Sequence, residues 1–180
     1  MRENRQGRLV TLVYGNLVAA NADPIEKKPL FHFQPGSFSY SIATAGCNFR
    51  CLHCQNAEIS QLPGETGRIP GEFVPPQQVA TQAQSLGCSS ISCTYTEPTV
   101  FLEYALDVAA AARQAGLKCV FVSNGYMGEE ARQSIVPLID AINIDLKGDD
   151  QFYRKVCSAR LEPVKHNIEQ FWKEGVWVEV

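Results

Sequence analysis

The feature that most constrains the fold of this chain is a regular alternation of short strand-like and longer helix-like segments from residue 39 onward. Helix-like apolar spacing follows Pro75-Pro76 and Pro98, precedes Pro137 and spans Glu162–Glu174. Strands separated by helices form right-handed βαβ units and a parallel sheet. We therefore predict an α/β protein, either an open barrel or a doubly wound sheet, with strands at Ser41–Thr44, Ser90–Tyr95, Lys118–Ser123, Ala141–Leu146 and Val176–Val180.

The N-terminal segment has a different pattern. Two apolar runs, Arg8–Tyr14 and Leu17–Ala20, flank the turn pair Gly15-Asn16, which predicts a β-hairpin. Proline and glycine then punctuate residues 23 to 36, as is typical of a loop. We predict a hairpin-and-loop appendage over residues 1–38 and a core domain over residues 39–180.

Polar residues follow the predicted parallel strands, at the edge where such folds bind ligands. The first strand runs into a cysteine-rich loop, and the second ends at Thr96-Glu97. The third ends at Ser123-Asn124, and the fourth ends at Asp145 to Lys147. The sequence therefore predicts a polar ligand site at this edge.

The fourth strand supports that prediction through its alternation. Side chains alternate across a strand, so one face carries Ile142, Ile144 and Leu146 and the other carries Asn143, Asp145 and Lys147. Central parallel strands are normally apolar on both faces, and burying unpaired charges is costly. We expect the polar face to line a cavity, although an internal Asp–Lys pair or a water-facing edge strand would give the same pattern.

The loop after the first strand contains Cys47, Cys51 and Cys54 at the spacing CxxxCxxC. Three thiols on one loop can converge on a metal centre, but closed structural sites use four protein ligands and catalytic sites leave a position open. Asn, Arg, His and Gln surround them, which is not a core environment. The remaining cysteines lie beside apolar residues and are expected in the core: Cys88, Cys93, Cys119 and Cys157.

Composition narrows the possible partners. The net charge is −3 with no basic block, which argues against binding nucleic acid through a phosphate-contacting patch. No apolar run approaches the ~20 residues that span a bilayer, and no signal region follows the first residues. We expect a cytoplasmic protein without a membrane partner, whose thiols stay reduced.

Taken together, the motifs resemble those of radical S-adenosylmethionine (SAM) enzymes. Within that superfamily the chain is similar to the pyruvate formate-lyase activating enzymes, and in particular to the AmmeMemoRadiSam subgroup. The runs that carry the resemblance are Val13-Tyr14-Gly15, Asp23-Pro24-Ile25-Glu26-Lys27-Lys28-Pro29-Leu30, Thr44-Ala45-Gly46-Cys47-Asn48-Phe49-Arg50-Cys51, Cys54-Gln55-Asn56, Tyr95-Thr96-Glu97-Pro98-Thr99, Ser123-Asn124-Gly125 and Asp145-Leu146-Lys147.

The resemblance implies roles for the cysteine loop. Cys47, Cys51 and Cys54 would bind three irons of a [4Fe–4S] cluster, and the fourth iron would chelate the amino and carboxylate groups of SAM. His53 would lie near the adenine.

It also implies roles for residues that follow the later strands. Thr96 and Glu97 align with a Gly-Gly-Glu stretch that contacts the methionine amino group, although both glycines are replaced here. Asp145 and Lys147 match an Asp-Leu-Lys run in the SAM pocket. Asn124 would face the ribose or carboxylate of SAM, or would simply be a turn residue.

The implied fold is a partial (β/α) barrel, since such cores usually have six βα units and this chain stops at the fifth strand. The implied reaction is reductive cleavage of SAM to a 5′-deoxyadenosyl radical that abstracts hydrogen. A flavodoxin- or ferredoxin-like protein would supply the electron, and the substrate would be a small molecule or a glycyl-radical partner protein. We further expect a fragment that is unstable alone or that pairs with the rest of the barrel or with a second copy.

Two other interpretations of the cysteines stay open at this point. One is a structural zinc site in which His53 or a distant thiol such as Cys88 completes the ligand set. The other is a redox switch with a transient disulfide. Zinc sites usually use two CxxC pairs, and no second pair exists here. The redox switch accounts for neither the polar face of the fourth strand nor the Glu97 motif.

Overall fold

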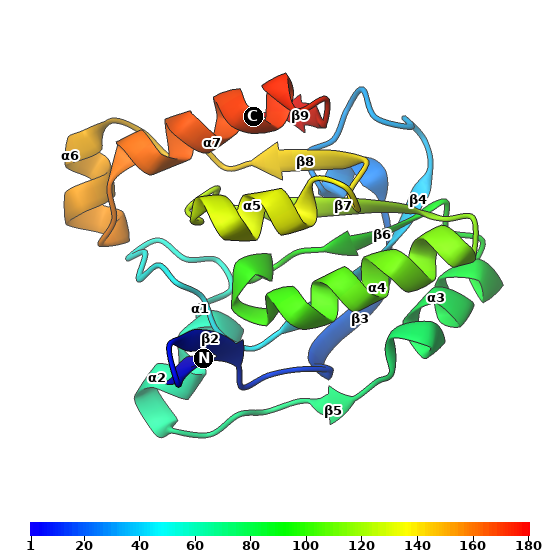
Figure 1. Ribbon diagram of the computed structural model, residues 1–180, viewed down its shortest axis with the longest axis horizontal. Coiled ribbons are helices and arrows are strands. Elements are labelled where there is room, and N and C mark those ends of the chain that lie inside the picture. Colours follow the sequence, from blue (N-terminus) through cyan, green and yellow to red (C-terminus); the bar gives the residue numbers. More distant parts are fainter.

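The computed structural model describes residues 1–180 apart from the side chain of Leu62. Its main sheet has the strand order β5-β3-β4-β6-β7-β8-β9 (Figure 1). The parallel strands confirm the predicted α/β architecture, with boundaries that shift by a few residues. They are β4 (Phe38–Thr44), β6 (Ser90–Cys93), β7 (Lys118–Ser123), β8 (Ala141–Ile144) and β9 (Trp177–Glu179).

Helices pack on the outer face of the parallel strands. In α4, the predicted apolar face is buried, and the chain leaves the helix at Gly116, whose φ is +72°. Outward-facing strand residues such as Ile42, Ile91 and Phe121 complete this core. The crossover segments are α3 (Pro76–Ser85), η2 (Pro98–Phe101), α4 (Leu102–Gln114), α5 (Glu129–Ile135), α6 (Asp150–Phe152), η3 (Tyr153–Cys157) and α7 (Leu161–Lys173).

The N-terminal hairpin is present, but its strands differ from the predicted ones. It pairs β1 (Arg2–Arg5) with β2 (Arg8–Thr11) around Gln6 and Gly7, both of which have positive φ. The predicted pairing across Gly15-Asn16 is wrong, because β3 (Asn16–Pro24) pairs with β4 and with β5 (Glu72–Phe73) in the main sheet. Gly15 does form a turn, but that turn directs β3 into the sheet. The division of the chain at residue 38 stays a prediction.

Residues 25–37, which we call the plug, follow β3 and cross the inner face of the sheet. The plug begins with the short helix η1 (Ile25–Lys27). Ile25 and Leu30 are fully buried against Val120 of β7 and Ala141 of β8. Asn143 Nδ2 donates a hydrogen bond to the Pro29 carbonyl oxygen at 3.1 Å. The plug therefore fills the inside of the open barrel beneath the carboxyl ends of the strands.

The plug also reaches the far edge of the sheet, where it runs close to β9 (Figure 1). The Glu179 carboxylate accepts hydrogen bonds from the backbone N–H groups of Phe31, His32 and Phe33 at 2.8 to 3.2 Å. One segment thus joins β3, at one side of the parallel strands, to β9 at the other.

Candidate cofactor and substrate pocket

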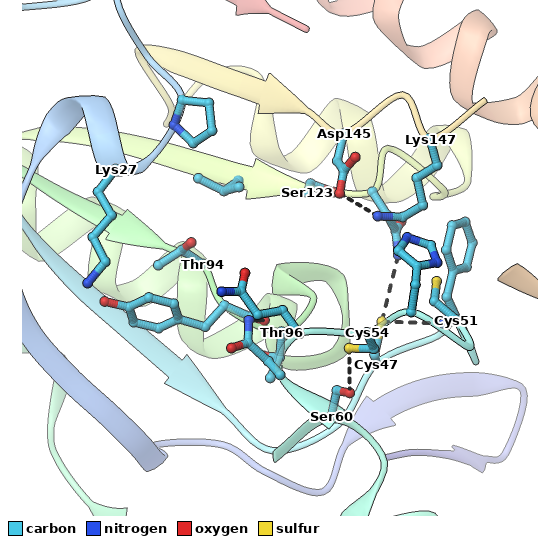
Figure 2. A pocket seen from close by; sticks show the side chains of 18 residues that line it. Lys27, Cys47, Cys51, Cys54, Ser60, Thr94, Thr96, Ser123, Asp145 and Lys147 are labelled. Atoms are coloured by element: carbon cyan, nitrogen blue, oxygen red, sulfur yellow. Dashed lines mark hydrogen bonds and ion pairs between the residues drawn. The ribbon is translucent and has the colours of Figure 1, made fainter. Parts of the chain in front are cut away.

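A pocket of about 730 Å³ opens at the carboxyl ends of the parallel strands, above the plug. Every residue that the sequence predicted for the site lines this pocket, except Glu97. Figure 2 shows the cysteines at one end of the pocket and Lys27 at the other. The lining residues are Lys27, Pro29, Cys47, Phe49, Cys51, His53, Cys54, Gln55, Asn56, Ser60, Thr94, Tyr95, Thr96, Val122, Ser123, Asn124, Asp145 and Lys147.

The cysteine loop is held in place by one buried aromatic side chain. Phe49 is 2% exposed and packs edge-on against the rings of Tyr126 and Tyr153, with centroids 5.2 and 6.2 Å apart. Its backbone N–H donates to Cys47 Sγ at 3.4 Å. The loop is followed by α1 (Ala57–Ser60) and α2 (Leu62–Thr66), and Ser60 Oγ lies 3.3 Å from Cys54 Sγ. These contacts anchor the loop whose three thiols line the pocket.

Burial disfavours the ionised form of two of these thiols. It raises the pKa of Cys47 and of Cys51 to about 12, and for Cys51 the neighbouring thiol of Cys157 adds to the effect. Metal-bound cysteine is a thiolate, so binding a metal here would release protons. Among the side chains that the structure describes, no three His, Cys, Asp or Glu residues converge closely enough to hold a single metal ion.

The three thiols nevertheless form a donor set of the kind that an iron–sulfur cluster uses. They line one end of a pocket whose neighbouring wall carries charged and amide side chains. This arrangement fits a cluster with one position left for another ligand. The other cysteines are buried, as predicted.

Asp145 and Lys147 extend from the end of β8 into the pocket, and they also pair with each other. Lys147 Nζ donates to the Asp145 carboxylate, and 13% of the Lys147 side chain is exposed against 56% of the Asp145 side chain. The predicted polar face and the internal ion pair are therefore both present. The Lys147 ammonium also lies near Cys51, where its charge acts to lower the pKa of that thiol.

Glu97 is buried behind the pocket wall and ties two strand ends together. Its Oε1 accepts hydrogen bonds from Ser123 Oγ at 2.9 Å and from the N–H and hydroxyl of Thr99. Its Oε2 accepts from the Asn124 N–H at 2.9 Å. Burial raises the pKa of this carboxyl, although the four donors oppose that shift. The predicted contact between Glu97 and SAM stays a prediction.

The remaining predicted residues are placed by local contacts. The Thr96 hydroxyl donates to the Thr44 carbonyl oxygen at 2.8 Å, which joins the second strand end to the cysteine loop. Asn124 Nδ2 donates to Asn48 Oδ1 at 2.6 Å. The His53 ring is tilted by 58° against Phe152, with centroids 5.4 Å apart.

Sequence reasoning missed the end of the pocket opposite the cysteines. Lys27 lies on the plug, and Tyr95 adopts φ +63°, a left-handed backbone that is uncommon outside glycine. Asn56 Nδ2 donates to the Tyr95 carbonyl oxygen at 2.7 Å and so connects the two ends of the pocket. These residues lie in runs that carried the family resemblance, but the sequence assigned no role in the site to Lys27, Tyr95 or Asn56.

Comparison with known families identifies this fold. The model of the radical SAM superfamily matches residues 41–180. This chain belongs to the radical SAM superfamily of enzymes. The matched range contains the cysteine loop and all the parallel strands except the first residues of β4, and it leaves out the plug.

Two curated relatives extend the comparison. An uncharacterized protein of Methanocaldococcus jannaschii is 46% identical over 179 residues, which covers 99% of this radical SAM chain and 53% of that protein. A Haemophilus influenzae protein named "putative glycyl-radical enzyme activating enzyme" is 25% identical over 120 residues, covering 67% of this chain and 45% of that protein. The chain thus spans about half the length of the curated relatives it matches.

Solved structures share the fold. Streptococcus suis SuiB bound to its precursor peptide SuiA superposes with a TM-score of 0.59 at 15% identity, covering 75% of this chain and 30% of SuiB. The SAM-bound form of SuiB gives 0.57 at 15% identity, covering 75% and 31%. These likenesses confirm the partial barrel. In the described part of the chain, no helix has both the length and the apolar character needed to cross a membrane.

Proposed function

We propose that this chain binds a [4Fe–4S] cluster through Cys47, Cys51 and Cys54 and binds SAM in the same pocket. The observation that carries the proposal is the position of the three thiols at one end of a polar pocket, inside a chain of the radical SAM superfamily. When bound and reduced, this pair of cofactors supplies a 5′-deoxyadenosyl radical that abstracts hydrogen from a substrate.

The side chains of the pocket would hold SAM through charge and shape. Asp145 and Lys147 present one negative and one positive group, which suits the amino and carboxylate groups of a zwitterion. The tilted pair of His53 and Phe152 offers an aromatic surface for a base such as adenine. Thr96 and Asn124 border the same space with polar side chains, and Glu97 fixes the backbone of Asn124.

The Lys147 ammonium would have a second effect on the cysteine end. Its positive charge favours the thiolate form of Cys51, which is the form that binds metal. Reductive cleavage of SAM needs an electron from outside the chain, and the family resemblance implies a donor protein of the flavodoxin or ferredoxin type. The proposal therefore includes such a donor as a partner.

For the substrate class we propose a glycyl-radical partner protein, so that the chain acts as an activating enzyme of the pyruvate formate-lyase type. The support is the name of the Haemophilus influenzae relative, which covers two thirds of this chain. A small-molecule substrate is the competing outcome.

The test is anaerobic reconstitution of the chain with iron and sulfide, followed by addition of SAM and a reductant. We expect a broad visible absorbance that changes when SAM is added, and formation of 5′-deoxyadenosine. Stoichiometric zinc with no such absorbance after reconstitution would reject the proposal in favour of a structural zinc site. A reversible disulfide within the loop and no bound metal would favour the redox switch.

A further inference from the structure

The end of the pocket opposite the cysteines is built around one buried carboxylate. Asp23 is 6% exposed and accepts hydrogen bonds from Lys27 Nζ at 2.8 Å and from Lys28 Nζ at 2.7 Å. The Tyr95 hydroxyl also donates to it. Asp23, Lys27 and Lys28 precede residues 41–180, the range that the superfamily model matches.

The two lysines of this cluster have different surroundings. The side chain of Lys28 is 0% exposed, and its ammonium lies 4.3 Å from the centroid of the Tyr95 ring. The side chain of Lys27 is 60% exposed and lines the pocket. Lys28 alone would match the charge of Asp23 and hold the plug in place. Lys27 is therefore a second cation beside a carboxylate that already has a partner.

Charge states follow from these contacts. Burial opposes ionisation of Asp23, but the donors around it hold the pKa of its carboxyl well below the usual range. The hydrogen bond to Asp23 raises the pKa of Lys27. Burial lowers the pKa of Lys28, and the contact with Asp23 opposes that shift. Two lysine side chains share one carboxylate at this end of the pocket, so Lys27 adds a positive group beyond the pair that Lys28 forms with Asp23.

Lys27 lines the edge of the cavity while its ammonium group contacts Asp23. Figure 2 shows Lys27 and Thr94 on the side of the pocket away from the cysteines. An ammonium has three donors, and the contact with Asp23 occupies one of them. Tyr95 keeps its strained backbone, with φ +63°, while its hydroxyl reaches Asp23. Strain of about 1–3 kcal/mol persists where the surroundings enforce it, often at ligand sites.

We propose that Lys27, together with the Thr94 hydroxyl, binds an anionic group of the substrate, either a carboxylate or a phosphate. Calling this ligand the substrate rests on the proposed function, because SAM would occupy the cysteine end. A cavity of about 730 Å³ provides room for both. The plug then sets substrate specificity from outside the region that the superfamily shares.

The experiment measures binding of two probes, inorganic phosphate and malonate, to the full chain through their effect on its thermal unfolding. Ligands that bind the folded state raise the unfolding temperature by mass action. We expect one probe to raise the unfolding temperature of the wild type. Lys27→Met should raise the Kd of that probe by about tenfold, which corresponds to the loss of one charge-assisted hydrogen bond. Lys27→Arg restores binding. Lys118→Met is the matched control, since Lys118 also pairs with one aspartate at 2.7 Å and is 50% exposed outside the pocket.

The larger of the two probe effects identifies the anion class. Stabilisation by neither probe, or equal loss in Lys27→Met and Lys118→Met, would overturn the proposal. A second measurement is the affinity for SAM of the reconstituted chain, which should stay within about twofold in Lys27→Met. A tenfold loss of SAM affinity would show that Lys27 serves SAM and would refute a separate substrate site. Anion binding without any iron–sulfur absorbance would instead reject the proposed function and leave the anion site standing.

Discussion

The two ends of the pocket are constructed in opposite ways. At the cysteine end, the functional atoms come from one loop of eight residues and are anchored by Phe49. At the Lys27 end, they come from β3, the plug and the strand end at Tyr95, which meet only in the folded chain. A short loop carries its own motif, whereas a surface assembled from distant segments does not. The shared chemistry of a superfamily can therefore stay constant at one end while specificity changes at the other.

The largest effect is expected at the cysteine end, where loss of one thiol should remove the cluster without affecting the Lys27 end. Cys51→Ala should abolish the iron–sulfur absorbance and the formation of 5′-deoxyadenosine, because it removes one of three thiol ligands. Iron and sulfide content after reconstitution is the measurement. Cys119→Ala, at a thiol that is 1% exposed in the core, should keep the cluster. Binding of the anion probe should survive in both variants, and its loss in Cys51→Ala alone would mean that the two ends are not separate.

A large effect on stability is expected at the other end. Asp23→Ala leaves the fully buried Lys28 ammonium without its partner, which typically costs about 3–5 kcal/mol in the free energy of unfolding. Urea unfolding monitored by circular dichroism measures this loss in the free energy of unfolding. Glu169→Ala removes an exposed ion pair on α7 and should change stability little. Comparable losses in the two variants would contradict the assignment of Asp23 as the anchor of the plug.

The same carboxylate predicts a pH dependence. The pKa of Asp23 is held below its ordinary value of 3.8, so its folded state favours the ionised form. Its contribution to stability is therefore complete above about pH 4 and is lost as the pH falls through the lower folded pKa. The difference in unfolding free energy between the wild type and Asp23→Asn should stay constant from pH 7 to 5. A difference that already shrinks in that interval would show that another group is responsible.

A smaller effect is expected when the link between the two ends of the pocket is removed. Asn56→Ala removes the hydrogen bond to the Tyr95 carbonyl oxygen and should reduce stability by about 1 kcal/mol. The cluster should still form, and the anion probe should bind several-fold more weakly because Tyr95 is less fixed. Asn21→Ala, at an exposed amide on β3, is the control. An unchanged probe affinity would mean that Tyr95 holds its position without Asn56.

The sequence predicted the elements whose signals are local. The parallel strands, the apolar face of α4 and the polar alternation that ends in Asp145 and Lys147 were all visible as periodicity. The partner of β3 was not, because a turn at Gly15 shows that the chain reverses but not which strand it meets next. The burial of Glu97 could not be predicted from the sequence either. It depends on hydrogen bonds from Thr99, Ser123 and Asn124, which come together only in the folded chain.

Lys27 illustrates the same limit within the site. Two adjacent lysines in a proline-flanked loop look like a solvated pair. Both lysines contact Asp23, but the Lys28 side chain is buried beside the Tyr95 ring while the Lys27 side chain lines the pocket. Contacts between segments far apart in sequence decide such roles, and composition does not record them.

The bond between Glu179 and the plug has a mechanical consequence. Three consecutive backbone amides attach the loop that carries Lys27 to a single carboxylate on β9. The plug, which lies beneath the pocket, is thereby bonded to β9 at the edge of the sheet. A change in the tilt of β9, whether from a neighbouring strand or from a docked protein, would shift the plug and with it Lys27, at the end of the pocket opposite the cysteines (Figure 2).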